Sequence, residues 1–216
     1  VGVGASSFRK QTAEQLLKEV RFDAIRGNIS EIKTLASLCG TQEKNSGNMA
    51  VSDTMDVEKI TDKSDHCGKI TGIDGSGRGV DADNADTVTE ENLAQHISNA
   101  KMLSKKLQTI VAITGAIDLV TDGSSCYVIR NGNPQMGHVT GAGCQLSGIL
   151  TAFLAANPEN KLQAAAAAVC MMGYAGELAA EKSGQSGSGT YRVSLMDAVS
   201  CMDGDILERG ARYEIR

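Results

Sequence analysis

The stretch from Val139 to Ala156 constrains the fold of this chain more than any other part of its sequence. It reads Val-Thr-Gly-Ala-Gly-Cys-Gln-Leu-Ser-Gly-Ile-Leu-Thr-Ala-Phe-Leu-Ala-Ala. We predict a strand that ends at Val139, a glycine turn over residues 141–143 and then an apolar helix. This junction is typical of α/β proteins that bind anions, because glycines allow close backbone approach and a helix N-terminus offers free N–H groups and partial positive charge.

Cys144 falls in the first turn of that predicted helix. A thiol at a helix N-terminus gains thiolate character, which makes it a candidate base or nucleophile. The alternative is that the Gly-x-Gly turn is purely structural and that Cys144 is a small buried residue, as lone cysteines usually are. The segment by itself leaves both interpretations open.

Length and charge limit the possible partners. The chain has 216 residues, of which 41% are hydrophobic, enough for the core of one α/β domain, and its net charge is −5. The negative net charge and the lack of basic clusters among aromatic residues argue against nucleic acid and anionic membranes as partners. The longest apolar run, Ala164–Met172, is shorter than a membrane span, and no signal-peptide pattern opens the chain. We expect a cytoplasmic protein that acts on a small molecule.

Hydrophobic periodicity predicts alternating helices and strands in the first part of the chain. We predict, in order, a helix over 12–20 with Thr12 and Gln15 as its capping box, a strand over 22–26, and a helix that opens at Asn28 and Glu31. Residues 39–78 are polar and rich in Gly, Ser and Asp, so we expect a surface insertion at about these positions.

The second part repeats the alternation. We predict a helix that opens at Thr89 and Glu90, a buried parallel strand over 109–113, short strands over 119–121 and 126–130, a helix that ends near Asn157-Pro158, a second helix over 163–182, and a loop over 183–189. Thr114 directly follows the parallel strand, and ligands of open α/β sheets bind at the carboxyl ends of such strands. Thr114 is therefore a candidate ligand contact.

Several of these segments together resemble the hydroxyethylthiazole kinase family, whose fold is ribokinase-like. They are, in the order in which the family has them, Val1-Gly-Val-Gly-Ala5, Ile25-Arg-Gly-Asn-Ile-Ser-Glu-Ile32, Ala112-Ile-Thr-Gly115 and Val139–Cys144. The resemblance implies an α/β/α sandwich with a mostly parallel central sheet, formed as a single domain over residues 1–216. It also implies that a substantial N-terminal segment precedes Val1 in the family, which leads us to expect that the sequence given is incomplete.

The family's activity is what the resemblance implies for this chain. The expected reaction is phosphorylation of the hydroxyl of 4-methyl-5-(2-hydroxyethyl)thiazole by ATP with Mg²⁺, in thiamin salvage. The resemblance also implies a homotrimer with active sites between subunits. Two alternatives stay open, namely another ribokinase-like kinase acting on hydroxymethylpyrimidine or pyridoxal, and a catalytically silent nucleotide-binding subunit.

The resemblance assigns roles to particular residues. It implies Arg26 and Thr114 as ATP contacts, Gly141 as a thiazole contact, Gly143 and Cys144 at the phosphate in transfer, and Glu31 as a magnesium ligand through water. Cys144 stands where most ribokinase-like sugar kinases carry an Asp base, and this replacement is typical of thiazole kinases. Positioning and charge neutralisation dominate phosphoryl transfer, so an activated thiol suffices. On spacing alone, Asn28 and Glu31 form a helix cap that needs no function.

Overall fold

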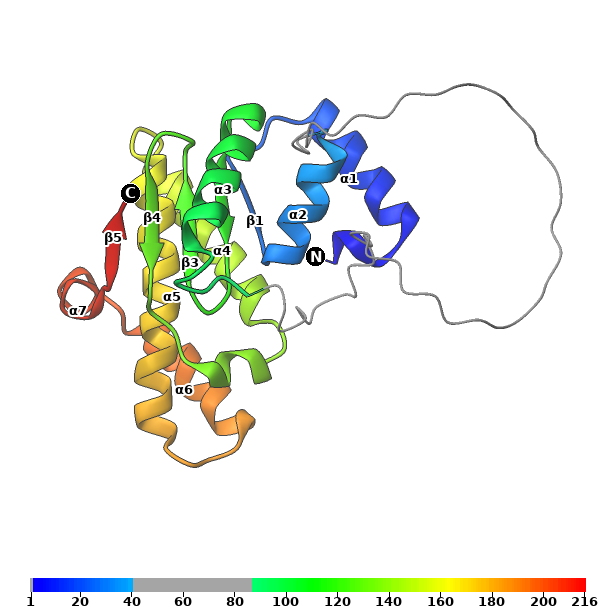
Figure 1. Ribbon diagram of the computed structural model, residues 1–216. Helices are drawn as coiled ribbons and strands as arrows, with labels where there is room; N and C mark the ends of the chain where they lie inside the picture. The colour runs from blue at the N-terminus through cyan, green and yellow to red at the C-terminus, as the bar shows by residue number, and fades with distance from the viewer. Residues whose placement is uncertain (1, 41–86) are drawn as a thin grey trace, which may run out of the picture.

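The computed structural model describes residues 2–40 and 87–216, so most of the predicted insertion at 39–78 lies outside the described residues. Figure 1 shows the arrangement of the elements. In chain order they are η1 (Val3–Ala5), α1 (Ser7–Glu19), β1 (Ala24–Gly27), α2 (Ile29–Leu38), α3 (Leu93–Leu107), β2 (Ile110–Ile113), β3 (Asp118–Thr121), β4 (Cys126–Ile129), η3 (Pro134–His138), α4 (Ala142–Ala156), α5 (Lys161–Ser183), α6 (Ser188–Ser200), α7 (Gly204–Gly210) and β5 (Tyr213–Ile215).

The described strands form one sheet in the order β1-β2-β3-β4-β5. Only β1 and β2 pair in parallel, whereas the β2–β3, β3–β4 and β4–β5 pairs are antiparallel. The predicted α/β class is confirmed, but the expectation of a mostly parallel sheet is wrong for the described part of the chain. The connections from β2 to β3 and from β3 to β4 are turns of a few residues, and such short connections join antiparallel neighbours.

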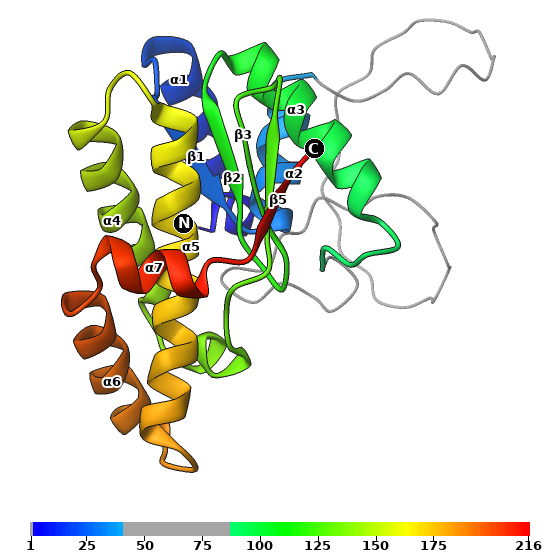
Figure 2. The same ribbon diagram turned by 90° about the vertical axis from the view of Figure 1, so that its left-hand side faces the viewer.

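Successive residues of the strands face opposite layers, which makes the fold a sandwich. Ile110 and Ala112 pack in the cluster formed with α4, α5 and α6, while Val111 and Ile113 pack in the cluster formed with α2 and α3. Figure 2 shows the sheet between these helical layers. Buried aliphatic runs such as β2 are expected when both faces of a sheet are covered.

Helix α5 is the central element of the larger cluster. It is long and apolar enough to cross a membrane, but 67% of its apolar stretch is buried inside the fold, which is the packing of a core helix. Its small residues allow close contact. A Cβ built on Gly173 would lie 2.7 Å from the carbonyl oxygen of Asn131, and only glycine permits this approach.

Several predicted boundaries differ from the structure. Helix α1 begins at Ser7 with Ser6 as its N-cap, because the Ser6 hydroxyl accepts a hydrogen bond from the N–H of Arg9, so Thr12 is not a cap. Val139 ends the 3-10 helix η3 rather than a strand, since the Asn133 side chain caps a turn whose first residue is Pro134. Helix α3 begins at Leu93, after a turn over 90–92, and not at Thr89.

Candidate active site

The candidate site lies where β1 and β2 both end. These parallel strands are in register from Ala24 with Ile110 to Gly27 with Ile113, so their carboxyl ends meet at one edge of the sheet. The N–H of Thr114 donates to the carbonyl of Gly27 over 2.9 Å and continues the pairing past β2. This edge is the usual ligand side of an open α/β sheet.

Arg26 and Thr114, the predicted ATP contacts, meet at this edge. The Nη2 group of Arg26 donates to the hydroxyl of Thr114 over 3.0 Å. Arg26 pairs in register with Ala112, whose side chain packs on the α4 and α5 side of the sheet. Among the described residues, the buried Nε of Arg26 has no hydrogen-bond partner. A buried donor without an acceptor is costly, so the guanidinium is suited to an acidic ligand.

Gly143 brings the start of α4 against the same guanidinium. A Cβ built at this position would lie 2.8 Å from Nη2 of Arg26, so a larger residue here would push the guanidinium away from its observed place. The first turn of α4 carries a partial positive charge, and the guanidinium beside it carries a full one. These positive groups repel each other, and a bound anion would offset that repulsion. The pair forms a positively charged cradle that is suited to an anionic ligand.

Gly141 and Cys144 lie on either side of Gly143 at the start of α4, and so belong to the same site. Gly141 is the N-cap of α4 with φ of 95°, a left-handed conformation that favours glycine. Cys144 lies in the first turn of α4 and is exposed. The alternative of a small buried cysteine is therefore wrong, although no contact in the described residues links its thiol to Arg26.

Glu31 forms the capping box predicted from the Asn-x-x-Glu spacing. Its N–H donates to the side chain of Asn28 over 2.8 Å, and its Oε2 accepts the N–H of Asn28 over 3.0 Å. Its other carboxylate oxygen accepts the N–H of Gly2, which ties η1 to the start of α2. A carboxylate oxygen can accept more than one hydrogen bond, so these contacts leave capacity for a metal-bound water.

The described residues contain no group of three or more His, Cys, Asp or Glu side chains that could hold a metal ion. Mg²⁺ in phosphoryl-transfer sites is held through substrate phosphates, retained waters and one or two carboxylates. The donor set at this edge, with Glu31 as its carboxylate, fits that mode of binding and not a cage made by protein ligands alone.

Asp118 is a further residue of this region, and no sequence motif predicts a role for it. It opens β3, is 8% exposed, and its Oδ1 accepts the N–H of Gly115 over 2.8 Å. Burial raises the pKa of this carboxyl to about 7, although the hydrogen bond from Gly115 and the charge of Arg26 act against that rise. The signal in the sequence was an acidic residue directly before the apolar Leu119 and Val120 of a predicted strand.

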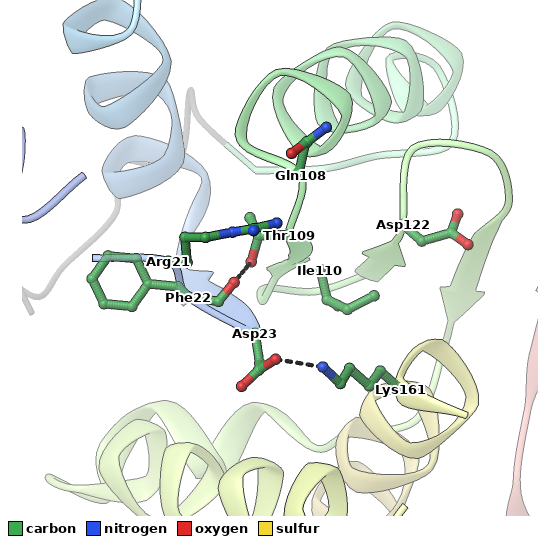
Figure 3. Close-up of a pocket in the computed structure, with 8 residues that line it drawn as sticks. All are labelled: Arg21, Phe22, Asp23, Gln108, Thr109, Ile110, Asp122 and Lys161. Carbon is green, nitrogen blue, oxygen red and sulfur yellow. Dashed lines mark hydrogen bonds and ion pairs between the residues drawn. The ribbon is translucent and has the colours of Figure 1, made fainter. Parts of the chain in front are cut away.

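A pocket of about 390 Å³ lies at the other end of the same strands. Figure 3 shows the residues that line it, among which Lys161 donates to Asp23 over 2.5 Å. The hydroxyl of Thr109 donates to the carbonyl of Phe22 at the same place. These residues lie at the amino ends of β1, β2 and α5, so the pocket faces away from the edge where Arg26 and Thr114 meet. None of the predicted site residues lines it, and it is not the candidate site.

Comparison with known proteins identifies relatives that are named hydroxyethylthiazole kinases. The model of the hydroxyethylthiazole kinase family matches residues 1–66 and 49–205. The hydroxyethylthiazole kinase of Clostridium acetobutylicum is 43% identical over 215 residues, which are 99% of this chain and 66% of that protein. The hydroxyethylthiazole kinase of Desulfovibrio desulfuricans is 34% identical over 224 residues, covering 100% of this chain and 66% of that protein.

A solved structure supports the fold. The chain resembles the hydroxyethylthiazole kinase from Pyrococcus horikoshii OT3 with a TM-score of 0.70 and 24% sequence identity, over 100% of this chain and 63% of that one. The chain therefore spans about two thirds of the length of the relatives that it matches.

Proposed function

This chain belongs to the hydroxyethylthiazole kinase family, and from that membership we propose that its protein transfers the γ-phosphoryl group of ATP to the hydroxyl of 4-methyl-5-(2-hydroxyethyl)thiazole. The observation that carries the proposal is the contact of the Arg26 guanidinium with the first turn of α4 at Gly143. That contact concentrates positive charge at the sheet edge where parallel strands end.

Each residue has a role in the proposed reaction. Arg26 and Thr114 bind ATP phosphates, and the N–H groups of Gly143 and Cys144 stabilise the phosphoryl group as it moves. Gly141 contacts the thiazole. The alcohol oxygen bonds to the γ-phosphorus while the bond from that phosphorus to the β-phosphate oxygen breaks, and ADP leaves. Cys144 is the base that accepts the proton of the alcohol.

Glu31 provides the carboxylate for magnesium in this proposal. Its capping box with Asn28 fixes the carboxylate at the start of α2, so a negative charge is held next to the end of β1. When bound, Mg²⁺ supplies neutralisation of phosphate charge. Glu31 would hold the ion through its bound waters, from which the carboxylate would accept hydrogen bonds.

The remaining expectations from the family are part of the same proposal. We propose one kinase domain over residues 1–216 with the insertion at about 39–78, a homotrimer as the assembled form, and the cytoplasm as its location. Sedimentation or light scattering measures the assembly directly, and a monomer at micromolar concentration would contradict the trimer.

The test is a substrate panel with the purified protein at its natural full length. ATP and Mg²⁺ are supplied with hydroxyethylthiazole, hydroxymethylpyrimidine or pyridoxal, and the phosphorylated product is identified by mass spectrometry. We expect phosphate on the thiazole alcohol and little on the other two. Preferential phosphorylation of hydroxymethylpyrimidine or pyridoxal would contradict the proposed substrate. ATP binding without any product would indicate a catalytically silent subunit.

A further inference from the structure

The turn between β2 and β3 presents Thr114 to the candidate ATP site. Thr114 meets Arg26 at its start, and Asp118 follows its end as the first residue of β3. The Asp118 carboxylate accepts the N–H of Gly115, the residue next to Thr114. The buried side chain of Asp118 therefore links the last part of this turn to its first part.

Because Asp118 is buried, its carboxyl group needs that hydrogen bond. The residue is 8% exposed, and a buried carboxyl without partners is strongly unfavourable. Its neighbours include the charged guanidinium of Arg26 on β1 and the Cys170 thiol on α5. The carboxylate thus lies near both the turn that carries Thr114 and the cation that Thr114 contacts.

We infer that Asp118 is a positioning residue of the ATP site, which keeps the Thr114 hydroxyl at the Arg26 guanidinium by holding the N–H of Gly115. This inference rests on the proposed function. Asp118 does not touch the phosphates in this role. It acts on nucleotide binding through Thr114, so removing either side chain should damage the same interaction.

A double-mutant cycle tests this coupling. Binding of Mg-ATP to the purified full-length protein is measured by calorimetry for the wild type, Asp118→Ala, Thr114→Ala and the double variant. We expect each single variant to bind about tenfold more weakly, and the double variant to bind no more weakly than the worse single one. Asp118→Asn, which keeps an acceptor for Gly115, should bind within about twofold of the wild type.

Asp122 provides the matched control. It follows the other end of β3 and also holds a turn, by accepting the N–H groups of Ser124 and Ser125. Asp122→Ala should lower the melting temperature and leave ATP affinity within about twofold. If Asp118→Ala does not fold, Asp118→Val fills the strand position without an acceptor and carries the same expectation.

The outcomes separate this inference from the proposed function. A wild-type protein that binds no ATP overturns both. If the wild type binds ATP but the losses of affinity in the two single variants multiply in the double variant, the inference alone is overturned. Asp118 then contributes only to stability. Unchanged affinity in Asp118→Ala or Asp118→Val also overturns the inference alone.

Discussion

Among individual residues, the contact between Gly143 and Arg26 connects the glycine motif to the proposed phosphate-binding site. The Gly-x-Gly pattern predicted a helix start suited to an anion, and α4 does start there. The sequence could not place Arg26 against that start, because the two residues are far apart in the chain and meet only through the packing of α4 on the sheet. Asp118 was missed because its burial near Arg26 is apparent only in the folded structure, although its hydrogen bond with Gly115 is local.

Gly143→Ala should weaken ATP binding. The added Cβ would lie 2.8 Å from Nη2 of Arg26, so the guanidinium must move. We expect the KM for ATP to rise about tenfold, since small displacements of a positioning group are costly. Gly148→Ala in the same helix is the control, because its Cβ meets nothing within 4 Å and alanine favours a helix. Equal KM values in both variants would contradict the contact.

Asp118 gives the folded protein a specific pH dependence. Its pKa is about 7 when folded and its ordinary value is 3.8, so between these values the folded state binds more protons than the unfolded state. The contribution of Asp118 to stability therefore falls as pH rises from about 4 to 7. Asp118→Asn should gain stability relative to the wild type as pH rises through this range, measured by urea unfolding. A difference that is constant with pH would contradict this account.

Among the helices and strands, local signals predicted some boundaries and missed others. The Asn28 and Glu31 capping box was confirmed, because both of its hydrogen bonds form within one turn. The start of α1 was misplaced, since Ser6 caps the helix ahead of the Thr-x-x-Gln pattern. The helices α6 and α7 and the strand β5 were not predicted at all. The buried face of α6 is set by contacts with α5, which a local pattern does not reveal.

Variants of Glu31 separate the cap from the proposed metal role. Glu31→Ala removes the acceptor for Asn28 and should cost about 1 kcal/mol of unfolding free energy. Glu31→Gln keeps an acceptor, so it should retain most of the stability while it raises the magnesium concentration needed for activity. Asp203→Ala, which uncaps α7 by removing the acceptor for Ile206, is the control for a lost cap. An unchanged magnesium profile in Glu31→Gln would leave only the cap.

Across the whole molecule, a polar cluster fastens the C-terminal strand to the core. Glu177 on α5 accepts two hydrogen bonds from Arg212, at 2.8 and 2.7 Å, and one from the N–H of Gly132. The buried side chain of Asn131 donates to the carbonyl of Gly210 and accepts the N–H of Arg212. The sequence predicted the α/β class and the layers, but not these long-range contacts or the antiparallel pairing of β5.

Glu177→Gln tests this cluster. Burial by itself raises the pKa of Glu177, but hydrogen bonds from Arg212, Gly132 and Asn131 outweigh it and lower the pKa below 4.5. The stabilisation is therefore present above the unfolded pKa and is lost as pH falls through the folded one. We expect Glu177→Gln to lose about 1–3 kcal/mol of unfolding free energy at neutral pH, and this loss should become smaller in acid. Glu181→Gln, at an exposed position of α5, should change little, and an equal loss there would contradict the cluster.

Transfer of labelled phosphate to hydroxyethylthiazole is the decisive measurement for the cradle formed by Arg26 and the start of α4. The full-length protein and its Arg26→Ala variant are given ATP labelled in the γ-phosphate, and the label on the thiazole alcohol is followed over time. We predict transfer by the wild type and a rate about 10² lower in Arg26→Ala, with the melting temperature little changed. Transfer at the wild-type rate in Arg26→Ala would show that this cradle does not hold the phosphate.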